Sequence, residues 1–140
     1  MPTGLLDPGE DIPEAAVREL KEETNLDGVM EGIVCFRQAH SPSRTSDLFF
    51  VCRMSLKDPL AEWKAQEDEI ADIRWMPVED YCDQDRWQGS PVYQSLNDSI
   101  RKASLVAQKE AGRSLNGMII HEKLPLGFGR GTNALFRSQL

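Results

Sequence analysis

GLLDPGEDIPEAAVRELKEETNL, residues 4–26, is the stretch of sequence that decides the fold. Its first part contains proline and two glycines and is typical of a loop. Asp11 and Glu14 then have the spacing of a capping box, in which each side chain accepts a hydrogen bond from the other residue's backbone N–H. Strong helix formers continue to Thr24, and Asn25 tolerates the left-handed conformation that ends helices. The stretch therefore predicts a loop followed by a helix.

Three carboxylates share one face of this predicted helix. Glu19, Glu22 and Glu23 stand at positions i, i+3 and i+4, which are neighbours on a helix surface. Like charges at this spacing repel one another, and a Mg²⁺ or Mn²⁺ ion that takes carboxylate oxygens relieves the repulsion. A solvated acidic face beside Arg18 and Lys21 is the alternative interpretation, and the charge pattern alone favours it.

The spacing of the charged residues favours the metal site instead. Gly4, five residues, Glu10, seven residues and then Arg18-Glu19-Leu20-Lys21-Glu22-Glu23-Thr24-Asn25-Leu26 resembles the Nudix box, G-x5-E-x7-R-E-U-x-E-E-x-G-U, where U is a bulky apolar residue. Every specified position matches except Asn25, which stands where the box has glycine. Because asparagine is the next most tolerant residue in a left-handed cap, we expect this departure to leave the metal site unchanged.

The resemblance to Nudix hydrolases implies a fold. It implies an α/β/α sandwich with a mixed sheet, which agrees with the alternation of helix and strand along this sequence. The length of 140 residues indicates one domain. The box normally follows several strands, whereas Gly4 stands almost at the first residue. We therefore expect a single Nudix domain over residues 1–140, with the box at residues 4–26, that lacks its first strands.

The resemblance also implies metal ligands. In the family the box glutamates coordinate one to three Mg²⁺ ions, and here these residues are Glu19, Glu22 and Glu23. Gly4 lies in the loop whose backbone approaches the metal and the diphosphate. Mg²⁺, or Mn²⁺ in its place, is the cofactor that we expect.

Arg18 and two of the glutamates are the expected catalytic residues within the box. The resemblance implies that Arg18 holds the site by ion pairs with box carboxylates, and Glu10 and Glu22 are the two candidate partners. Family members differ in the general base. Some use a box glutamate, here Glu22 or Glu23, and others use a glutamate on a later loop.

Glu69 is the candidate base or fourth ligand outside the box. It stands just before an apolar segment, from which its carboxylate can reach the box helix. A plain surface charge is the competing interpretation, and Glu67 and Asp68 compete with Glu69 for the role.

The rest of the chain predicts strands from apolar, β-branched and aromatic runs, and a second long helix from apolar residues at helical spacing. The predicted elements are strands at residues 29–37, 47–56 and 69–77, a helical turn at 78–82, a helix at 95–111, and short strands at 119–120 and 134–136. Residues 41–46 and 58–68 are predicted to be irregular. The continuous apolar run in residues 48–52 indicates a strand buried on both faces.

Downstream motifs are similar to one subgroup of the family, which contains plant ADP-ribose/NADH pyrophosphatases and the animal fibroblast-growth-factor antisense Nudix protein. The motifs are Phe36-Arg37-Gln38-Ala39-His40, Ser46-Asp47-Leu48-Phe49-Phe50-Val51-Cys52, Glu69-Ile70 and Trp75-Met76-Pro77. Within them, we expect His40 to form a local hydrogen bond at a strand end. We expect Trp75 to be a core or sheet-edge aromatic residue.

Composition excludes several classes of function. The net charge of −7 and the lack of a basic run argue against nucleic-acid binding, because a phosphate polymer would be repelled. No apolar run approaches the ~20 residues that span a bilayer. Cys35, Cys52 and Cys82 have no CxxC spacing and indicate reduced thiols. With no signal peptide at the N-terminus, these features predict a cytoplasmic protein.

The expected function is Mg²⁺-dependent hydrolysis of the pyrophosphate bond in a nucleoside diphosphate linked to another moiety. ADP-ribose and NAD(H) are the substrates that the resemblance favours, so the expected partner is a small nucleotide. Sheet edges left by missing strands favour association, for example a homodimer. The alternative is a truncated, non-catalytic Nudix remnant that acts as a binding or interaction protein. The intact glutamates favour the enzyme, and the missing strands favour the remnant.

Overall fold

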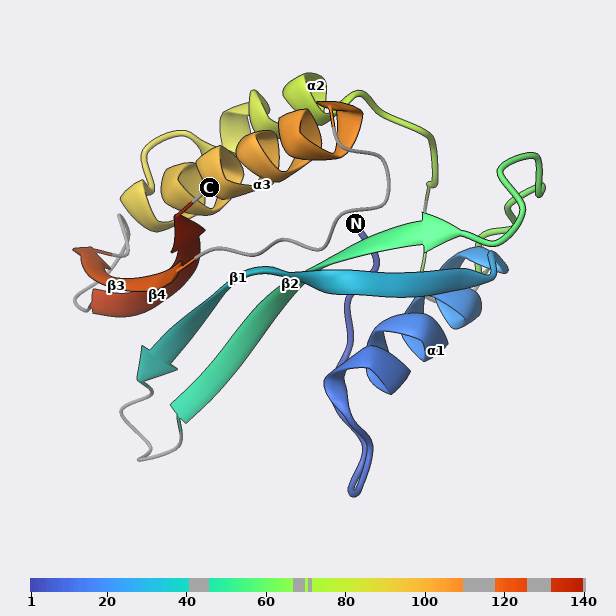
Figure 1. Cartoon of the computed structure of the whole chain (residues 1–140), viewed down its shortest axis with the longest axis horizontal. Helices are drawn as coiled ribbons and strands as arrows, with labels where there is room; N and C mark the ends of the chain where they lie inside the picture. The colour runs from blue at the N-terminus through green and yellow to red at the C-terminus, as the bar shows by residue number, and fades with distance from the viewer. Residues whose placement is uncertain (41–45, 67–69, 71, 110–117, 126–131, 140) are drawn as a thin grey trace. The chain divides into compact units, whose positions relative to one another are not determined.

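The computed structural model describes residues 1–40, 46–66, 70, 72–109, 118–125 and 132–139, with side chains described as far as residue 105. Its elements in chain order are α1 (Ile12–Thr24), β1 (Gly28–His40), β2 (Ser46–Leu56), α2 (Val78–Cys82), the 3₁₀ helix η1 (Asp85–Trp87), α3 (Pro91–Lys109), β3 (Met118–Pro125) and β4 (Thr132–Gln139) (Figure 1). The predicted box helix, second long helix, helical turn and four of the five predicted strands are confirmed.

The four strands form one sheet in the order β2-β1-β4-β3. Strand β4 pairs antiparallel with β1, where Phe36 lies opposite Phe136, and also antiparallel with β3, where His121 lies opposite Phe136. Helices combined with an antiparallel sheet confirm the predicted α/β fold class. The parallel pair that would make the sheet mixed is not seen among the described strands.

The chain divides into two compact units. The first comprises residues 1–32 and 52–75 and contains α1, the beginning of β1 and the end of β2. The second comprises residues 33–51 and 76–140 and contains the rest of both strands, the other helices, β3 and β4. The single domain predicted over residues 1–140 stays a prediction. Among the helices of the described residues, none combines the length and apolar character that crossing a bilayer requires.

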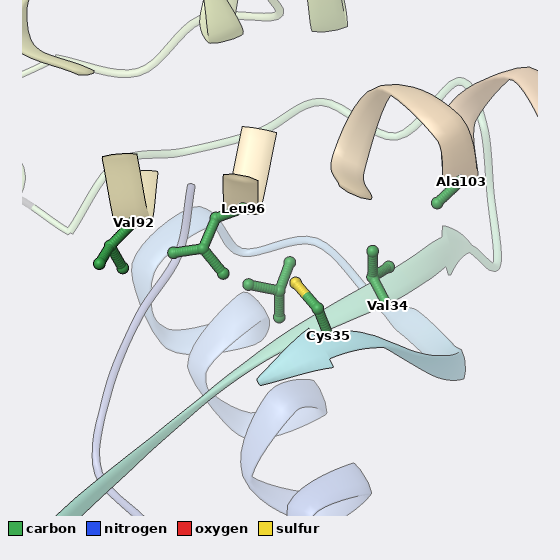
Figure 2. Packing of buried hydrophobic residues seen from close by; sticks show 6 residues of the cluster. Val34, Cys35, Val92, Leu96 and Ala103 are labelled. Atoms are coloured by element: carbon green, nitrogen blue, oxygen red, sulfur yellow. The ribbon is translucent and has the colours of Figure 1, made fainter. Parts of the chain in front are cut away.

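The core of the second unit lies between the strands and α3 (Figure 2). Its buried residues are Val34 and Cys35 of β1, Val51 of β2, and Val92, Leu96 and Ala103 of α3. The three α3 residues fall on one face because their spacing follows the helical repeat. This packing also explains why α3 begins at Pro91, four residues before the predicted start. Proline suits the first turn of a helix, and Val92 belongs to the face that packs.

The first unit buries the apolar side of α1. Ala15 and Leu20 of α1 are buried, as is Leu26 just after the helix. Gly28 lies so close to α1 that a Cβ there would come 2.5 Å from Cδ2 of Leu20 and 3.2 Å from the carbonyl oxygen of Ser55. The small residue at the start of β1 therefore lets this strand begin directly against the helix.

The strand predicted at residues 69–77 is wrong for the residues of that segment that the structure describes. Residues 70 and 72–77 have no strand pairing. The backbone N–H of Ile70 donates instead to the carbonyl oxygen of Gln66 at 2.9 Å. Trp75 is 66% exposed and belongs to no strand, so it is neither the core nor the sheet-edge residue that the sequence predicted. The prediction rested on the apolar character of this segment, which does not show whether a neighbouring strand is present to pair with it.

The continuous apolar run of β2 indicated a strand buried on both faces, and this prediction is wrong. Leu48 is 49% exposed, whereas Val51 is buried. The two residues lie on opposite faces of β2, because side chains alternate along a strand, so only the face that carries Val51 packs against the core.

Candidate metal and catalytic site

Both ends of α1 are fixed as the sequence predicts. At the start, the Asp11 backbone N–H donates to the Glu14 carboxylate at 2.9 Å, within a capping box. At the end, Asn25 adopts the left-handed conformation with φ of 59°, and its N–H donates to the carbonyl oxygen of Lys21 at 2.8 Å. Asparagine thus adopts the left-handed backbone conformation expected of the box glycine. The helix that carries the glutamates therefore ends where the motif predicts.

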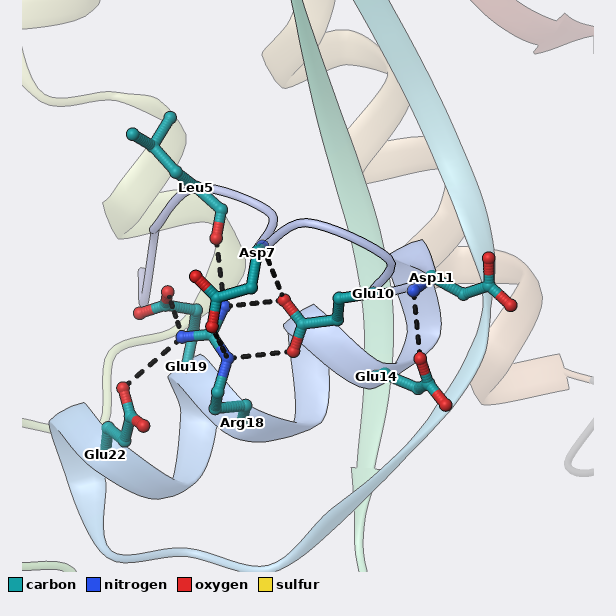
Figure 3. Close-up of polar contacts among 8 residues, drawn as sticks. All are labelled: Leu5, Asp7, Glu10, Asp11, Glu14, Arg18, Glu19 and Glu22. Carbon is teal, nitrogen blue, oxygen red and sulfur yellow. Dashed lines mark hydrogen bonds and ion pairs between the residues drawn. The ribbon is translucent and has the colours of Figure 1, made fainter.

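Arg18 is the centre of the polar network on α1 (Figure 3). Its Nε and Nη2 donate to the two carboxylate oxygens of Glu10, each at 2.8 Å. Nη2 also donates to the carbonyl oxygen of Leu5 at 2.9 Å. This two-pronged pair is the strongest geometry available to an arginine and a carboxylate, so it anchors the preceding loop to the helix. Of the two predicted partners, Glu10 is the closer one.

The third guanidinium nitrogen of Arg18 contacts two box glutamates. Nη1 donates to Oε1 of Glu19 at 2.6 Å and lies 3.4 Å from Oε2 of Glu22. Glu23 is held separately, because the Thr3 backbone N–H donates to its Oε1 at 3.1 Å. All three predicted carboxylates are therefore positioned by Arg18 or by the N-terminal loop.

Gly4 lies directly against Glu19. A Cβ at residue 4 would overlap the carboxylate of Glu19, so any side chain there must displace that group. The glycine that opens the box is therefore required for the close approach of the loop backbone to a box carboxylate. The structure thus places Gly4 against Glu19 and joins Arg18 to Glu19 and Glu22, while Glu23 is bonded to Thr3; their joint role in a metal site stays a prediction.

Glu10 and Arg18 are both charged at neutral pH. The Arg18 guanidinium, helped by the backbone N–H of Asp7, lowers the pKa of the Glu10 carboxyl from 4.5 to about 2. In return, hydrogen bonds to Glu10 and Glu19 raise the pKa of Arg18 above its usual value. The Glu10–Arg18 ion pair therefore persists through the pH range in which most enzymes work.

The donor chemistry of the three carboxylates fits a hard divalent cation. Within the described residues, one oxygen of each accepts no hydrogen bond: Oε2 of Glu19, Oε1 of Glu22 and Oε2 of Glu23. No three His, Cys, Asp or Glu side chains of that part of the chain are gathered closely enough to hold a metal ion. Because the Glu22 side chain is 54% exposed, it has room to turn toward the other two.

Of the two residues outside the box that the sequence singled out, the structure describes His40 and does not describe Glu69. Glu69 lies outside the described residues, as do its competitors Glu67 and Asp68. His40 forms the expected local contact at the end of β1, where its Nδ1 lies 3.2 Å from Oγ of Ser46.

Sequence reasoning missed the loop groups that complete the network. The Leu5 carbonyl and the Thr3 N–H are backbone atoms, which every residue has, so no side-chain pattern marks them. Asp7 offered a weak signal as an acidic residue in the loop. Its backbone N–H donates to Glu10 at 3.0 Å, and its carboxylate lies 3.9 Å from Nε of Arg18.

The sequence match agrees with this geometry. The family model described as NUDIX domain matches residues 1–96, and the chain belongs to the Nudix family. It is 44% identical to Nudix hydrolase 2 of Arabidopsis thaliana over 98 residues, which cover 69% of this chain and 34% of that protein. It is 29% identical to Nudix hydrolase 7 of the same plant over 122 residues, 86% of this chain and 40% of that protein.

An animal relative is similar to a shorter part of the chain. Nucleoside diphosphate-linked moiety X motif 6 of Mus musculus is 36% identical over 81 residues, which cover 56% of this chain and 25% of that protein. Plant and animal Nudix proteins are the relatives that the downstream motifs predicted. The chain spans about a third of the length of the curated relatives that it matches.

Proposed function

We propose that this chain hydrolyses the pyrophosphate bond of a nucleoside diphosphate linked to another moiety. The observation that carries the proposal is the network in which Arg18 and the N-terminal loop hold three glutamates on one helix. Its family and the names of its relatives support the same reaction class. ADP-ribose and NAD(H) are the substrates that we propose first, on the similarity of the downstream motifs.

We propose Mg²⁺, or Mn²⁺, as the cofactor, held by Glu19, Glu22, Glu23 and the backbone of Gly4. Such an ion, when bound, neutralises charge on a diphosphate and lowers the pKa of a bound water. The chain must then supply a carboxylate that accepts a proton from that water. Glu22 and Glu23 are the candidates on α1, and Glu69 is the candidate beyond it. Arg18 acts as a positioning residue, because its hydrogen bonds are directed to carboxylates.

A substrate screen tests the proposal. The purified chain is incubated with ADP-ribose, NADH or diadenosine polyphosphates, with Mg²⁺ or Mn²⁺. The chain is then removed by filtration, excess Mg²⁺ is added, and phosphate is measured after treatment with a phosphatase that attacks only terminal phosphates. We expect ADP-ribose or NADH to yield phosphate, because cleavage gives AMP and ribose 5-phosphate or nicotinamide mononucleotide. EDTA should abolish the release. No release from any substrate with either metal would contradict the proposal.

A non-catalytic binding role is the second candidate. The observation that favours it is that Arg18 already pairs with Glu19 and Glu22, while the described residues contain no gathered group of metal ligands. Calorimetry separates the two candidates. Nucleotide binding without metal-dependent turnover would favour the binding role.

We also propose a homodimer in a reducing, cytoplasmic compartment, with a small nucleotide as the partner. The presence of Cys35, Cys52 and Cys82 as thiols supports the compartment. Exposed apolar side chains such as Leu5 and Leu48 support association. Light scattering of the purified chain gives its mass and decides between monomer and dimer.

A further inference from the structure

An open hollow with two tryptophans lies in the segment that follows β2. Its volume is about 430 Å³, and it is lined by Pro59, Leu60, Ala61, Glu62, Trp63 and Trp75. Trp63 is 41% exposed and Trp75 is 66% exposed. Small-molecule sites commonly have volumes of about 300–1,000 Å³ and aromatic linings, so the size and chemistry of this Trp63–Trp75 hollow suit a small ligand.

Hydrogen bonds fix the hollow beside the end of α1. The Lys64 N–H donates to the carbonyl oxygen of Thr24 at 2.8 Å, and the Gln66 N–H donates to that of Glu23 at 3.3 Å. Glu23 is one of the three box glutamates, so the segment that forms the hollow is bonded to the backbone of the proposed metal site. A turn centred on Asp58 shapes the other side, where the Leu60 N–H donates to its carboxylate at 2.9 Å.

The chemistry of the lining selects an uncharged planar ring. Indole rings stack on nucleobases of any sequence, because every base presents a π-face. A phosphate would be disfavoured in the same place, since Glu62 carries a negative charge and the chain as a whole has a net charge of −7. A nucleotide therefore has one end that suits the hollow and another that suits a cation on the box glutamates.

We propose that the Trp63–Trp75 hollow binds the nucleobase of the nucleotide substrate. The inference rests on the proposed function, because it takes the ligand to be a nucleotide whose diphosphate lies at the box glutamates. Recognition is by stacking, so the hollow accepts different bases and does not distinguish them by hydrogen bonding. Trp63 and Trp75 are binding residues under this proposal and take no part in the proton transfer.

Intrinsic tryptophan fluorescence in EDTA tests the inference without any turnover. The 140-residue chain is titrated with AMP and, separately, with ribose 5-phosphate, which carries the same phosphate and no base. We expect AMP to quench the fluorescence and ribose 5-phosphate to have no effect. Trp87 is the matched control, because it lies in a different aromatic cluster, with its Nε1 donating to the carbonyl oxygen of Tyr81 at 2.9 Å. The Trp87→Phe variant should keep the AMP response.

Variants of the hollow complete the test, with AMP affinity measured by calorimetry. Trp63→Ala and Trp75→Ala should each weaken binding about tenfold or more, whereas Trp63→Phe retains a ring and most of the affinity. Circular dichroism confirms that each variant is folded. No AMP binding by the wild-type chain, unchanged affinity in both alanine variants, or equal binding of ribose 5-phosphate would overturn the inference. Quenching by self-association without ligand would also overturn it, because a second copy would then cover the hollow.

The binding assay separates the inference from the proposed function. Base-dependent binding through the two tryptophans, without hydrolysis of any substrate, would support the inference and contradict the catalytic proposal. Hydrolysis of a substrate, with the affinity for AMP unchanged in both alanine variants, would support the catalytic proposal and contradict the inference.

Discussion

At the residue scale, Arg18 determines where two box carboxylates lie. Its guanidinium uses one edge to bind Glu10 and its remaining nitrogen to contact Glu19 and Glu22. Lysine has the same charge but a single point donor, so it cannot reproduce this fork. The identity of the side chain matters here, beyond its charge.

We predict that Arg18→Lys lowers metal-dependent turnover by about 10–100-fold, the usual effect of removing a group that orients metal ligands. Arg101→Lys is the matched control, because Arg101 also pairs with three carboxylates, those of Glu79, Asp83 and Asp98, and lies in the second unit. Steady-state rates with saturating Mg²⁺ are compared. Equal losses in the two variants would show that Arg18 has only a general structural role.

Gly4→Ala tests the close approach of the loop to Glu19. The added Cβ overlaps the Glu19 carboxylate, so the carboxylate or the loop must move. Because displacements of about 1 Å cost roughly 100-fold in rate, we expect a loss of that order with the helix content retained. Gly32→Ala is the control, since a Cβ at Gly32 meets nothing within 4 Å. An active Gly4→Ala variant would place Glu19 outside the site.

The Glu10–Arg18 pair makes the stability of the fold depend on pH in acid. Its folded-state pKa of about 2 lies below the usual 4.5, so its ionisation stabilises the fold above about pH 4.5. That contribution is lost as the pH falls from about 4.5 to about 2. We therefore expect the melting temperature of the wild type to fall more across this window than that of Glu10→Gln. Parallel pH profiles would show that the Arg18 pair contributes no stability.

At the element scale, α1 was predictable because its signals are local. The capping residue, the helix formers and the left-handed cap at Asn25 all act within a few residues of the positions they determine. The strand predicted at residues 69–77 failed because pairing depends on a neighbour that the run itself does not specify. The start of α3 was missed although Pro91 marks it, since the apolar spacing was followed only from residue 95.

The predictability of the site follows the same division. The motif spacing identified the side chains that Arg18 contacts, because the fixed separations between the charged residues of the box determine which of them share a helix face. It could not identify the Thr3 N–H or the Leu5 carbonyl, which act through the backbone. The Trp63–Trp75 hollow was also unpredictable, because Trp75 was expected in the core or at a sheet edge, and its exposure depends on tertiary structure.

Asn25 sets the end of α1, and its conformation gives a stability prediction. With φ of 59°, an alanine there would cost about 1 kcal/mol, because it lacks the short polar side chain whose local hydrogen bonding lets asparagine adopt the left-handed region. Asn25→Ala should lower the free energy of unfolding by that amount in urea titrations. Asn25→Gly should not lower it. Equal stability of all three proteins would mean that the helix end does not depend on this residue.

At the scale of the whole molecule, the proposed chemistry lies within one of the two units. The Arg18 network and the Trp63–Trp75 hollow belong to residues 1–32 and 52–75, whereas the core around Val92 and Leu96 belongs to the other unit. The acidic composition predicted a protein that binds phosphate groups through a metal ion. The fold class followed from the order of the elements, and the division into units did not, because it depends on tertiary contacts.

The central claim is that the glutamates of α1 carry out metal-dependent pyrophosphate hydrolysis. The most direct measurement is the initial rate of ADP-ribose hydrolysis at saturating Mg²⁺ for Glu22→Gln, Glu23→Gln and Glu14→Gln. Glu14 is the matched control on the same helix, because glutamine also completes a capping box. We predict a loss of about 100-fold or more in the first two variants, with unchanged melting curves, and full activity in the third. Wild-type rates in both Glu22→Gln and Glu23→Gln would contradict the claim.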